Sequence, residues 1–342
     1  MSVLSSLRIR NLRCIRRADL SLPQGLVWLR GANGAGKTTL LEAIYLLDRG
    51  RTFRGRRSGP VTTRGEAATT VVGVVDDGGR PRKLQWTSQD GGAVAGPALT
   101  RFVGTSSYSV VEGDPALRRR FLDWSLFHVE RRAPELWRRV KRLQQQRNAW
   151  LRGGARGKAV WDAPYVEELA ELWGLRTHFL HVVNDAYQDL TTTLCPAGAL
   201  GLRWHWSGQG RDLGEVLASH LAGDMERGYT FLSPSRGDLV FERESLPWSG
   251  SRGENKIAGM LLQLAVQDVV RRSGSAPQVV LLDDPYAEVS EMHIGPVVRR
   301  WLESADQLIV TSLADRQEPG AGLDVAAMFH VEQGDVKSMA DQ

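Results

Sequence analysis

A glycine-rich segment that ends in Lys37 and Thr38 carries the clearest chemistry in this sequence. Residues 31–38 read Gly-Ala-Asn-Gly-Ala-Gly-Lys-Thr, which fits the phosphate-binding loop pattern. Its glycines allow backbone N–H groups to wrap phosphates at a helix N-terminus. In such a loop the lysine reaches the β and γ phosphates and the threonine ligates magnesium. We therefore expect ATP with Mg2+ to bind here, held by Gly31, Ala32, Asn33, Gly34, Ala35, Gly36, Lys37, Thr38 and Thr39.

The segments on either side favour a genuine phosphate site over a chance glycine turn that carries a surface lysine. Residues 26–29 are an apolar strand pattern directly before the loop. Residues 38–47 follow as an amphipathic helix pattern, whose apolar face consists of Leu40, Leu41, Ile44 and Leu47. A strand before and a helix after are the two conditions that this motif requires.

Two carboxylates follow a second apolar strand pattern. Residues 279–282 read Val-Val-Leu-Leu, and Asp283 and Asp284 come next. At the end of a buried parallel strand, Asp283 is the expected magnesium carboxylate, held through water, and Asp284 can orient the attacking water or accept its proton. A strand-ending turn, Asp-Asp-Pro, is the alternative interpretation. The phosphate-loop pattern upstream favours the metal site.

More than two hundred residues separate these two motifs, which is typical of ATPases of the ABC and SMC type with a large insertion. Such proteins dimerise head to head and complete each ATP site with a Ser-and-Gly motif from the partner. Ser251-Arg252-Gly253-Glu254 heads a predicted helix about thirty residues before Asp283. We expect Ser251 and Gly253 to receive a γ-phosphate across the interface, with Ser251 and Asp284 as the catalytic residues. An ordinary helix N-cap is the alternative for Ser251.

The order of elements indicates how these motifs come together. Strand patterns fill both ends of the chain, whereas residues 134–152 and 164–194 are long helical patterns. The later α/β series comprises a helix at 255–271, the strand at 279–282, a helix near 297–302 and a strand at 308–310. We expect an α/β fold, an ABC/SMC-type ATPase head assembled from residues 1–100 and 225–342, with a helical lobe inserted at residues 101–224.

Positive charge is concentrated in the middle of the chain. The net charge is +5, but residues 101–158 hold fourteen Lys or Arg against five Asp or Glu. Such a concentration favours contact with nucleic-acid phosphates, and a solvated helix face is the alternative. The candidate DNA contacts are Arg51, Arg54, Arg56 and Arg57 after the phosphate-loop helix, and Arg138, Arg139 and Arg142 in the lobe.

Other arginines have a structural alternative. Arg147 falls on the apolar stripe of its helix with Leu143 and Trp150, so a buried ion pair is an equal possibility for it. Arg118, Arg119 and Arg120 precede a segment, Phe121-Leu122-Asp123-Trp124, that we interpret as core, and they could brace the joint between head and lobe.

Remaining features narrow the class of protein. Cys14 and Cys195 are far apart and have no partners at metal-ligand spacing, so neither a disulfide framework nor a zinc site is expected. No run of about twenty apolar residues is present, and the first thirty residues are typical of a strand rather than a signal peptide. We expect a cytoplasmic protein without a membrane partner.

Several strings together resemble one family, the RecF proteins of bacterial recombination, nearly end to end. They are Leu7-Arg8-Ile9-Arg10-Asn11-Leu12-Arg13, the phosphate loop with Leu41-Glu42-Ala43-Ile44, Thr52-Phe53-Arg54, Arg118-Arg119-Arg120-Phe121-Leu122-Asp123-Trp124, Gln146-Arg147-Asn148 and Ser251-Arg252-Gly253. The resemblance implies an ATP-dependent DNA-binding homodimer with a weak, DNA-stimulated ATPase. It also implies loading of recombinase at single-strand gaps with RecO and RecR, on single-stranded or gapped duplex DNA, in repair and the SOS response.

Two departures from the family pattern keep alternatives open. Glu254 stands where the family usually has Gln, and Ser290 stands where it has the Asp that couples the two sites of the dimer. These residues motivate a second hypothesis, an ATP-binding regulatory or structural repair subunit without turnover. A transporter ATPase subunit is a third hypothesis, which the basic lobe and the Arg-Phe-Leu-Asp-Trp string disfavour.

Overall fold

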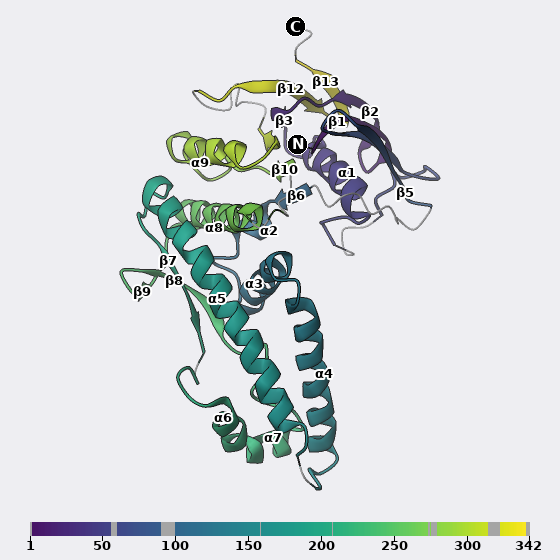
Figure 1. Ribbon diagram of the computed structural model, residues 1–342. Helices are drawn as coiled ribbons and strands as arrows, with labels where there is room; N and C mark the ends of the chain where they lie inside the picture. Colours follow the sequence, from purple (N-terminus) through teal and green to yellow (C-terminus); the bar gives the residue numbers. More distant parts are fainter. Residues whose placement is uncertain are drawn as a thin grey trace.

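The computed structural model describes residues 2–55, 60–89, 100–157, 159–206, 208–272, 274, 279–313 and 322–339. A head of sheets and helices lies at one end of the molecule, and an elongated helical lobe extends from it (Figure 1). Both ends of the described chain lie in the head. The described strands form three sheets, two in the head and a small one in the lobe.

A six-stranded sheet is the centre of the head, in the order β13-β12-β3-β11-β10-β6. All neighbouring pairs are parallel except β12 with β13. The strands are β3 (Gly25–Gly31), β6 (Thr100–Val103), β10 (Val279–Leu282), β11 (Gln307–Ser312), β12 (Val325–Glu332) and β13 (Asp335–Ser338). Because parallel strands share one carboxyl edge, residues that follow β3, β10 and β11 meet there.

Alternate residues of the central strands enter two different cores, which explains their nearly continuous apolar runs. Val27, Val279 and Ile309 pack with α1 (Lys37–Arg49) and with an antiparallel sheet, β2-β1-β4-β5. Trp28, Val280 and Leu308 face the other way. The strands of the antiparallel sheet are β1 (Ser2–Leu12), β2 (Ile15–Ser21), β4 (Thr70–Asp77) and β5 (Pro81–Thr87).

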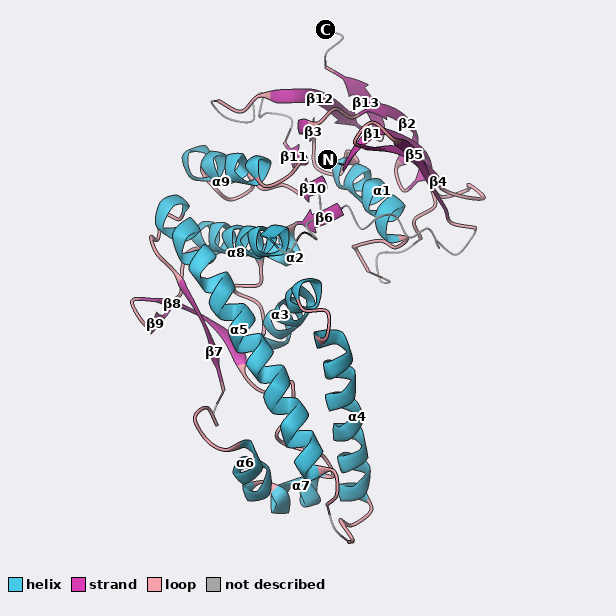
Figure 2. Cartoon of the chain, viewed as in Figure 1, coloured by secondary structure: helices cyan, strands magenta, loops and turns pink. Residues whose placement is uncertain are grey.

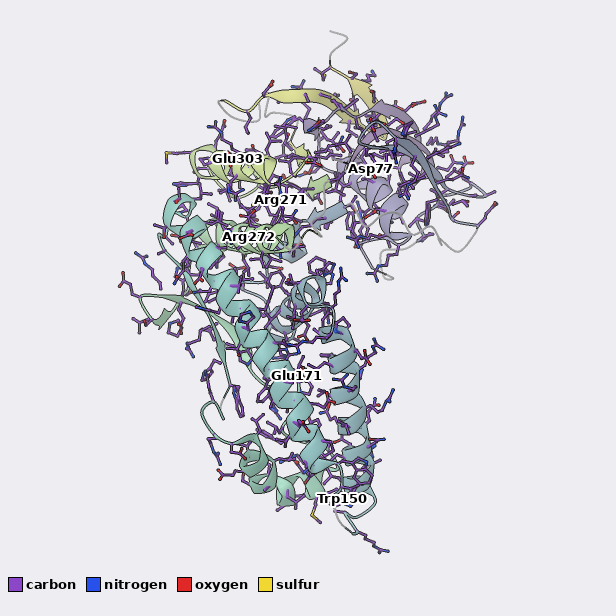
Figure 3. The ribbon with its side chains drawn as sticks, viewed as in Figure 1. Asp77, Trp150, Glu171, Arg271, Arg272 and Glu303 are labelled. Atoms are coloured by element: carbon purple, nitrogen blue, oxygen red, sulfur yellow. The ribbon has the colours of Figure 1, made fainter. Side chains whose placement is uncertain are left out.

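Two long helices cover the second face of the central sheet. α8 (Arg252–Arg272) and α9 (Glu291–Glu303) lie side by side there, and α2 (Thr105–Tyr108) packs on α8. At their C-terminal ends the Arg271 guanidinium donates to the carbonyl oxygen of Glu303 at 3.1 Å, and these two residues lie close together in Figure 3. No described helix is long and apolar enough to cross a membrane.

The lobe is built around two antiparallel helices, α4 (Ala133–Arg152) and α5 (Asp162–Leu194) (Figure 2). α5 runs from the tip of the lobe back to α8. The remaining lobe elements are α3 (Pro115–Val129), β7 (Gly201–His205), α6 (Leu213–Ser219), α7 (Leu221–Arg227), β8 (Asp238–Arg243) and β9 (Leu246–Pro247). The expected α/β head with a helical lobe is therefore present.

The expected division at residues 101 and 224 remains a proposal about domain limits. β6, at the first residues of the segment assigned to the lobe, pairs with β10 in the head sheet. β8 lies beyond residue 225 but pairs with β7. One element of the head sheet thus begins the range proposed for the lobe, and one strand of the lobe lies within the range proposed for the head.

Ion pairs between elements brace the lobe, and Arg118, one of the three arginines with a structural alternative, makes one of them. The Arg118 guanidinium bonds both carboxylate oxygens of Asp238, at 2.8 and 2.6 Å, and Arg176 does the same with Asp123, at 2.8 Å each. The core interpretation of Phe121-Leu122-Asp123-Trp124 is wrong for its last residue, because Trp124 is 42% exposed. α3 turns that indole away from the core that holds Leu122.

Candidate functional site

The phosphate loop joins β3 to α1 with a backbone that only glycine adopts readily. Gly34 has φ of 77° and Gly36 has φ of 119°, both in the region that side chains disfavour. No side chain caps the N-terminus of α1. The N–H groups of the first turn of α1 thus have no capping side chain, which is the arrangement that binds phosphate.

Close packing against β12 explains the first glycine of the loop. A Cβ added to Gly31 would lie 2.2 Å from the carbonyl oxygen of Val331, which is a backbone atom that cannot give way. Gly334, after β12, donates its N–H to the carbonyl oxygen of Ala35 at 2.9 Å. Thus β12, which the sequence patterns did not predict, fixes one side of the loop.

Lys37 is folded back onto its own loop. Its Nζ donates to the carbonyl oxygens of Gly31 and Ala32 at 2.8 and 2.9 Å, and the residue is 8% exposed. Burial lowers the pKa of Lys37, while Asp284 and Asp283 oppose that shift. An ammonium placed between loop carbonyls and two carboxylates suits an incoming polyphosphate.

The two sequence motifs meet at the carboxyl edge of the central sheet. The Thr38 hydroxyl donates to Oδ1 of Asp283 at 2.9 Å, although 245 positions separate the two residues. Thr311, at the end of β11, donates its hydroxyl to the same oxygen at 2.9 Å. Burial raises the pKa of Asp283, and the hydrogen bonds from Thr38 and Thr311 oppose that shift. The threonine and the carboxylate that the sequence motifs assign to one magnesium site are therefore in contact.

These donors fit Mg2+ of the kind that accompanies a nucleotide. Thr38 and Asp283 offer a hydroxyl and a carboxylate oxygen side by side, and magnesium prefers oxygen ligands. No group of three or more His, Cys, Asp or Glu that could hold a metal occurs among the described residues. One carboxylate, with substrate phosphates and waters as further ligands, is the usual composition of such a site.

Asp284 lies next to this pair in an unusual backbone conformation. Its φ is 51°, in the left-handed region, and its N–H donates to the Thr311 hydroxyl at 2.8 Å. Its carbonyl oxygen accepts a hydrogen bond from Nζ of Lys256 on α8 at 2.8 Å. Thr311 and Lys256 of the same chain therefore fix the backbone of Asp284, the residue that we expect to orient the attacking water.

Ser251 and Glu254 form a capping box at the start of α8. The N–H and the hydroxyl of Ser251 both donate to Oε2 of Glu254 at 2.8 Å, and the Glu254 N–H donates to the Ser251 hydroxyl at 3.4 Å. These bonds lower the pKa of Glu254. Gly253 lies against the segment after β10, where an added Cβ would be 3.0 Å from the carbonyl oxygen of Glu288.

Within the described part of this single chain, no hydrogen bond joins Ser251 or Gly253 to the phosphate loop. Ser251 caps the N-terminus of α8, which is the alternative role considered for it. Ser251 is also exposed, as a contact with a second copy requires. The role in a composite ATP site stays a prediction.

Three residues at or near the site were given no role from the sequence. Thr311 is the penultimate residue of a buried parallel strand, so its place near the carboxyl edge was the available clue. Lys256 bonds only to backbone carbonyls, which leave no pattern. Arg13, in the turn between β1 and β2, bonds both carboxylate oxygens of Glu42 on α1, at 2.6 and 2.8 Å. Arg13 thus ties that turn to the helix that follows the loop.

The candidate DNA arginines after α1 divide into paired and free groups. Arg54 lies 3.4 Å from Glu42, whereas Arg51 is exposed and makes no ion pair with any described residue. Arg56 and Arg57 lie outside the described residues. Between the two described members of this set, Arg51 is the one without an ion pair to a described residue.

The lobe arginines divide in the same way. Arg138 and Arg142 are exposed one turn apart on α4. Arg139 is held by Glu168 of α5 at 2.9 Å. Arg147 is fully buried and bonds Asp162 and Asp224 at 2.8 Å each, so the buried ion pair holds for this residue.

Comparison with known proteins adds a family. Residues 6–78 match the model of a family described as an AAA domain. The chain is similar to a DNA replication and repair protein RecF from Pseudomonas putida (strain W619), with 32% identity in an alignment of 339 residues that covers 92% of this chain and 92% of the relative. A relative of the same description in Pseudomonas entomophila (strain L48) is 31% identical, over 99% of this chain and 98% of its own.

Solved structures agree on the fold. A structure of the recombination mediator protein RecF with ATP, in the RecFOR pathway, is 19% identical, has a TM-score of 0.77 and is matched over 99% of each chain. This likeness confirms the predicted α/β architecture of an ATPase head with an inserted helical lobe.

Proposed function

The chain belongs to the RecF family, and from this we propose that it binds ATP, dimerises with ATP bound and binds DNA in recombinational repair. The observation that carries the proposal is the contact between Thr38 and Asp283 at the N-terminus of α1. That contact unites a phosphate loop with the carboxylate that a magnesium nucleotide needs. Curated relatives named for DNA replication and repair support the biological setting.

ATP would take the place of the loop's internal contacts. Lys37 would exchange its bonds to the carbonyls of Gly31 and Ala32 for the β and γ phosphates, and the N–H groups at the start of α1 would bond the phosphate oxygens. Thr38 and Asp283 would hold Mg2+, which supplies positive charge against the phosphates. Asp284 would orient the water, with its backbone fixed by Thr311 and Lys256.

A second copy of the chain would complete the site with Ser251 and Gly253. The hydroxyl of Ser251 and the N–H groups of the first turn of α8 would then face the γ-phosphate. Ser251 already donates to Glu254, so the carboxylate competes for the same hydroxyl. This competition favours a second candidate, an ATP-binding repair subunit that dimerises without useful turnover.

DNA would meet exposed arginines, chiefly Arg51, Arg138 and Arg142. Such contacts neutralise phosphates without reading sequence, so binding should weaken steeply with added salt. Single-stranded or gapped duplex DNA, and action with RecO and RecR in SOS-linked repair in the cytoplasm, complete the proposal. The similarity to a structure from the RecFOR pathway supports that part.

The test is DNA binding with ATP, with ADP and without nucleotide, measured together with dimer mass. The expected result is a dimer with ATP and a parallel gain in DNA affinity. Retained dimerisation and DNA binding without single-turnover hydrolysis would favour the second candidate. A protein that neither binds DNA at low salt nor dimerises with ATP would contradict both.

A further inference from the structure

A cavity of about 790 Å³ opens between the head and the lobe, away from the phosphate loop. Its walls come from the C-terminal end of α1, the segment that follows it, β6 and α3. α3 lies on the lobe side of β6, with α2 between them in the view of Figure 2. Because Tyr45, the lining residue of α1 nearest the loop, comes eight residues after Lys37, about 12 Å of helix separate this cavity from the phosphate loop. A ligand here would not compete with ATP for the loop.

Aromatic side chains from three elements line the cavity. Phe53 and Phe102 stack face to face, with ring centroids 3.7 Å apart and an angle of 11° between the rings. The Tyr45 ring meets Phe53 edge-on at 5.5 Å. α3 adds Phe121 and the 42% exposed Trp124. A large ring kept this exposed, on a helix that buries Leu122, offers a surface for another flat ring.

Cationic and amide groups are placed among these rings. Arg51 and Arg120 line the cavity, are exposed, and make no ion pair with any residue that the structure describes. Gln263 and Arg101 also line it, and both are buried; the guanidinium of Arg101 donates to Gln263 at 2.9 Å and lies 5.7 Å from the Trp124 ring. Nε of Arg101 is buried and has no hydrogen-bond partner among the described residues.

Aromatic rings beside unpaired guanidinium groups recognise a flat, polar ring that carries an anion. Nucleobases stack on such rings, and arginine neutralises the phosphate next to them. An apolar peptide segment would leave Arg51, Arg120 and the Arg101 Nε without partners. The volume lies in the range of small-ligand sites and can hold a nucleotide.

We propose that this cavity takes one unstacked nucleobase, with its adjoining phosphate on Arg51 and Arg120. The base comes from a single-stranded segment of DNA or from a free nucleotide, and the DNA source rests on the proposed function. A base inside the cavity would make binding prefer single-stranded DNA over duplex. Phosphate contacts with arginines alone would not produce this preference for single-stranded DNA.

The test uses an oligonucleotide with one 2-aminopurine, a duplex of equal length, and dAMP. Binding of the single strand and of the duplex is measured with ATP present. Binding of dAMP is measured in the Lys37→Ala variant, in which the phosphate loop is disabled. Trp124→Leu should weaken single-strand binding by about 5- to 100-fold and abolish the change in 2-aminopurine fluorescence, with duplex binding unchanged. If the tryptophan variant fails to fold, Arg120→Ala, a change at an exposed position, should also weaken single-strand binding.

Two matched controls come from far surfaces. Trp150→Leu removes a tryptophan at the tip of the lobe (Figure 3), and Arg17→Ala removes an exposed arginine of β2; both should bind like wild type. Equal losses for single strand and duplex, or no loss in either, would overturn the base site while DNA binding stands. If wild type binds no DNA, the proposed function fails. In that case, dAMP binding that is lost in Trp124→Leu still supports a base site in the cavity. If dAMP does not bind, the proposed base site is overturned as well.

Discussion

Nζ of Lys256 donates to the carbonyl oxygen of Asp284 at 2.8 Å and to that of Ala287 at 2.7 Å. Lys256 lies on the second turn of α8, whose first turn follows Ser251, and Asp284 follows the strand that carries the magnesium carboxylate. Burial lowers the pKa of Lys256, and the nearby carboxylates of Asp284, Glu288 and Asp283 oppose that shift. One ammonium thus connects the segment that would face a partner's ATP to the segment that would orient water on its own ATP.

Lys256→Met should uncouple these two segments. Loss of two charge-assisted bonds frees the backbone at Asp284, so ATP-dependent dimerisation should weaken by about 10-fold while ATP affinity changes by less than about 2-fold. Analytical ultracentrifugation with and without ATP measures the first quantity, and nucleotide titration the second. Lys83→Met, at an exposed position of β5, is the control. Equal losses of affinity and dimerisation would indicate general damage to the site instead.

The parts of the site that could be predicted from the sequence are those that follow a regular pattern of apolar residues or a spaced motif. Apolar strand patterns predicted β3, β10 and β11, and the motifs after the first two of these patterns placed Thr38 and Asp283 in one magnesium site. β6 and β12 were not predicted: β6 reads Thr-Arg-Phe-Val and lacks the continuous apolar run of β10, and β12 mixes buried and exposed positions without alternation. Lys256 was missed because its partners are backbone carbonyls brought close only by the tertiary fold.

Lys37→Ala should remove ATP binding without unfolding the head. The ammonium bonds only carbonyls of its own loop, so the loss of these contacts is tolerated, whereas a triphosphate loses a charge-assisted partner. We expect ATP affinity to fall at least about 10-fold and the ATP-dependent dimer to disappear. Titration with a fluorescent ATP analogue, alongside a thermal melt, measures both effects. Unchanged affinity would refute the assignment of this loop.

Glu254→Gln should strengthen ATP-dependent dimerisation. Glutamine preserves the capping box but removes a negative charge beside the hydroxyl that would meet the γ-phosphate. Relief of that repulsion predicts a gain of about 3- to 10-fold in dimer affinity with ATP and none without it. Glu215→Gln, in the first turn of α6 on the lobe, changes the same charge at an unrelated helix start. A gain in both variants would mean that overall charge, and not this site, is responsible.

The effect of Glu254→Gln on dimerisation should not change with pH in the neutral range. Hydrogen bonds from the N–H and hydroxyl of Ser251 hold the pKa of Glu254 below its ordinary value of 4.5. The carboxylate is therefore ionised throughout the range above about pH 5.5, and the difference between wild type and Glu254→Gln should be constant there. The part of helix stability that depends on this carboxylate is present above pH 4.5 and lost as pH falls through the lowered pKa. A difference that varies between about pH 6 and 8 would point to another titrating group.

Asp224→Ala should destabilise the lobe strongly. Asp224 is fully buried and accepts hydrogen bonds at 2.8 Å each from the guanidinium of Arg147 and the N–H of Phe231. Removing it leaves a buried guanidinium with half of its charge compensation, which costs about 3 to 5 kcal/mol. Urea denaturation followed by circular dichroism measures the change. Glu168→Ala, which breaks the exposed pair with Arg139, is the matched control and should leave the midpoint nearly unchanged.

Arg138→Ala with Arg142→Ala should reduce the salt dependence of DNA binding, whereas Arg139→Ala should not. All three lie on α4, but the first two are exposed without an acidic partner among the described residues, and Arg139 is held by Glu168. Each lost phosphate contact lowers the slope of log affinity against log salt by about 1, so the double variant should lose about 2. Titrations of one oligonucleotide at several salt concentrations give the slopes directly. An unchanged slope in the double variant, with Arg51→Ala lowering it, would place the DNA on the head alone and remove α4 from the interface.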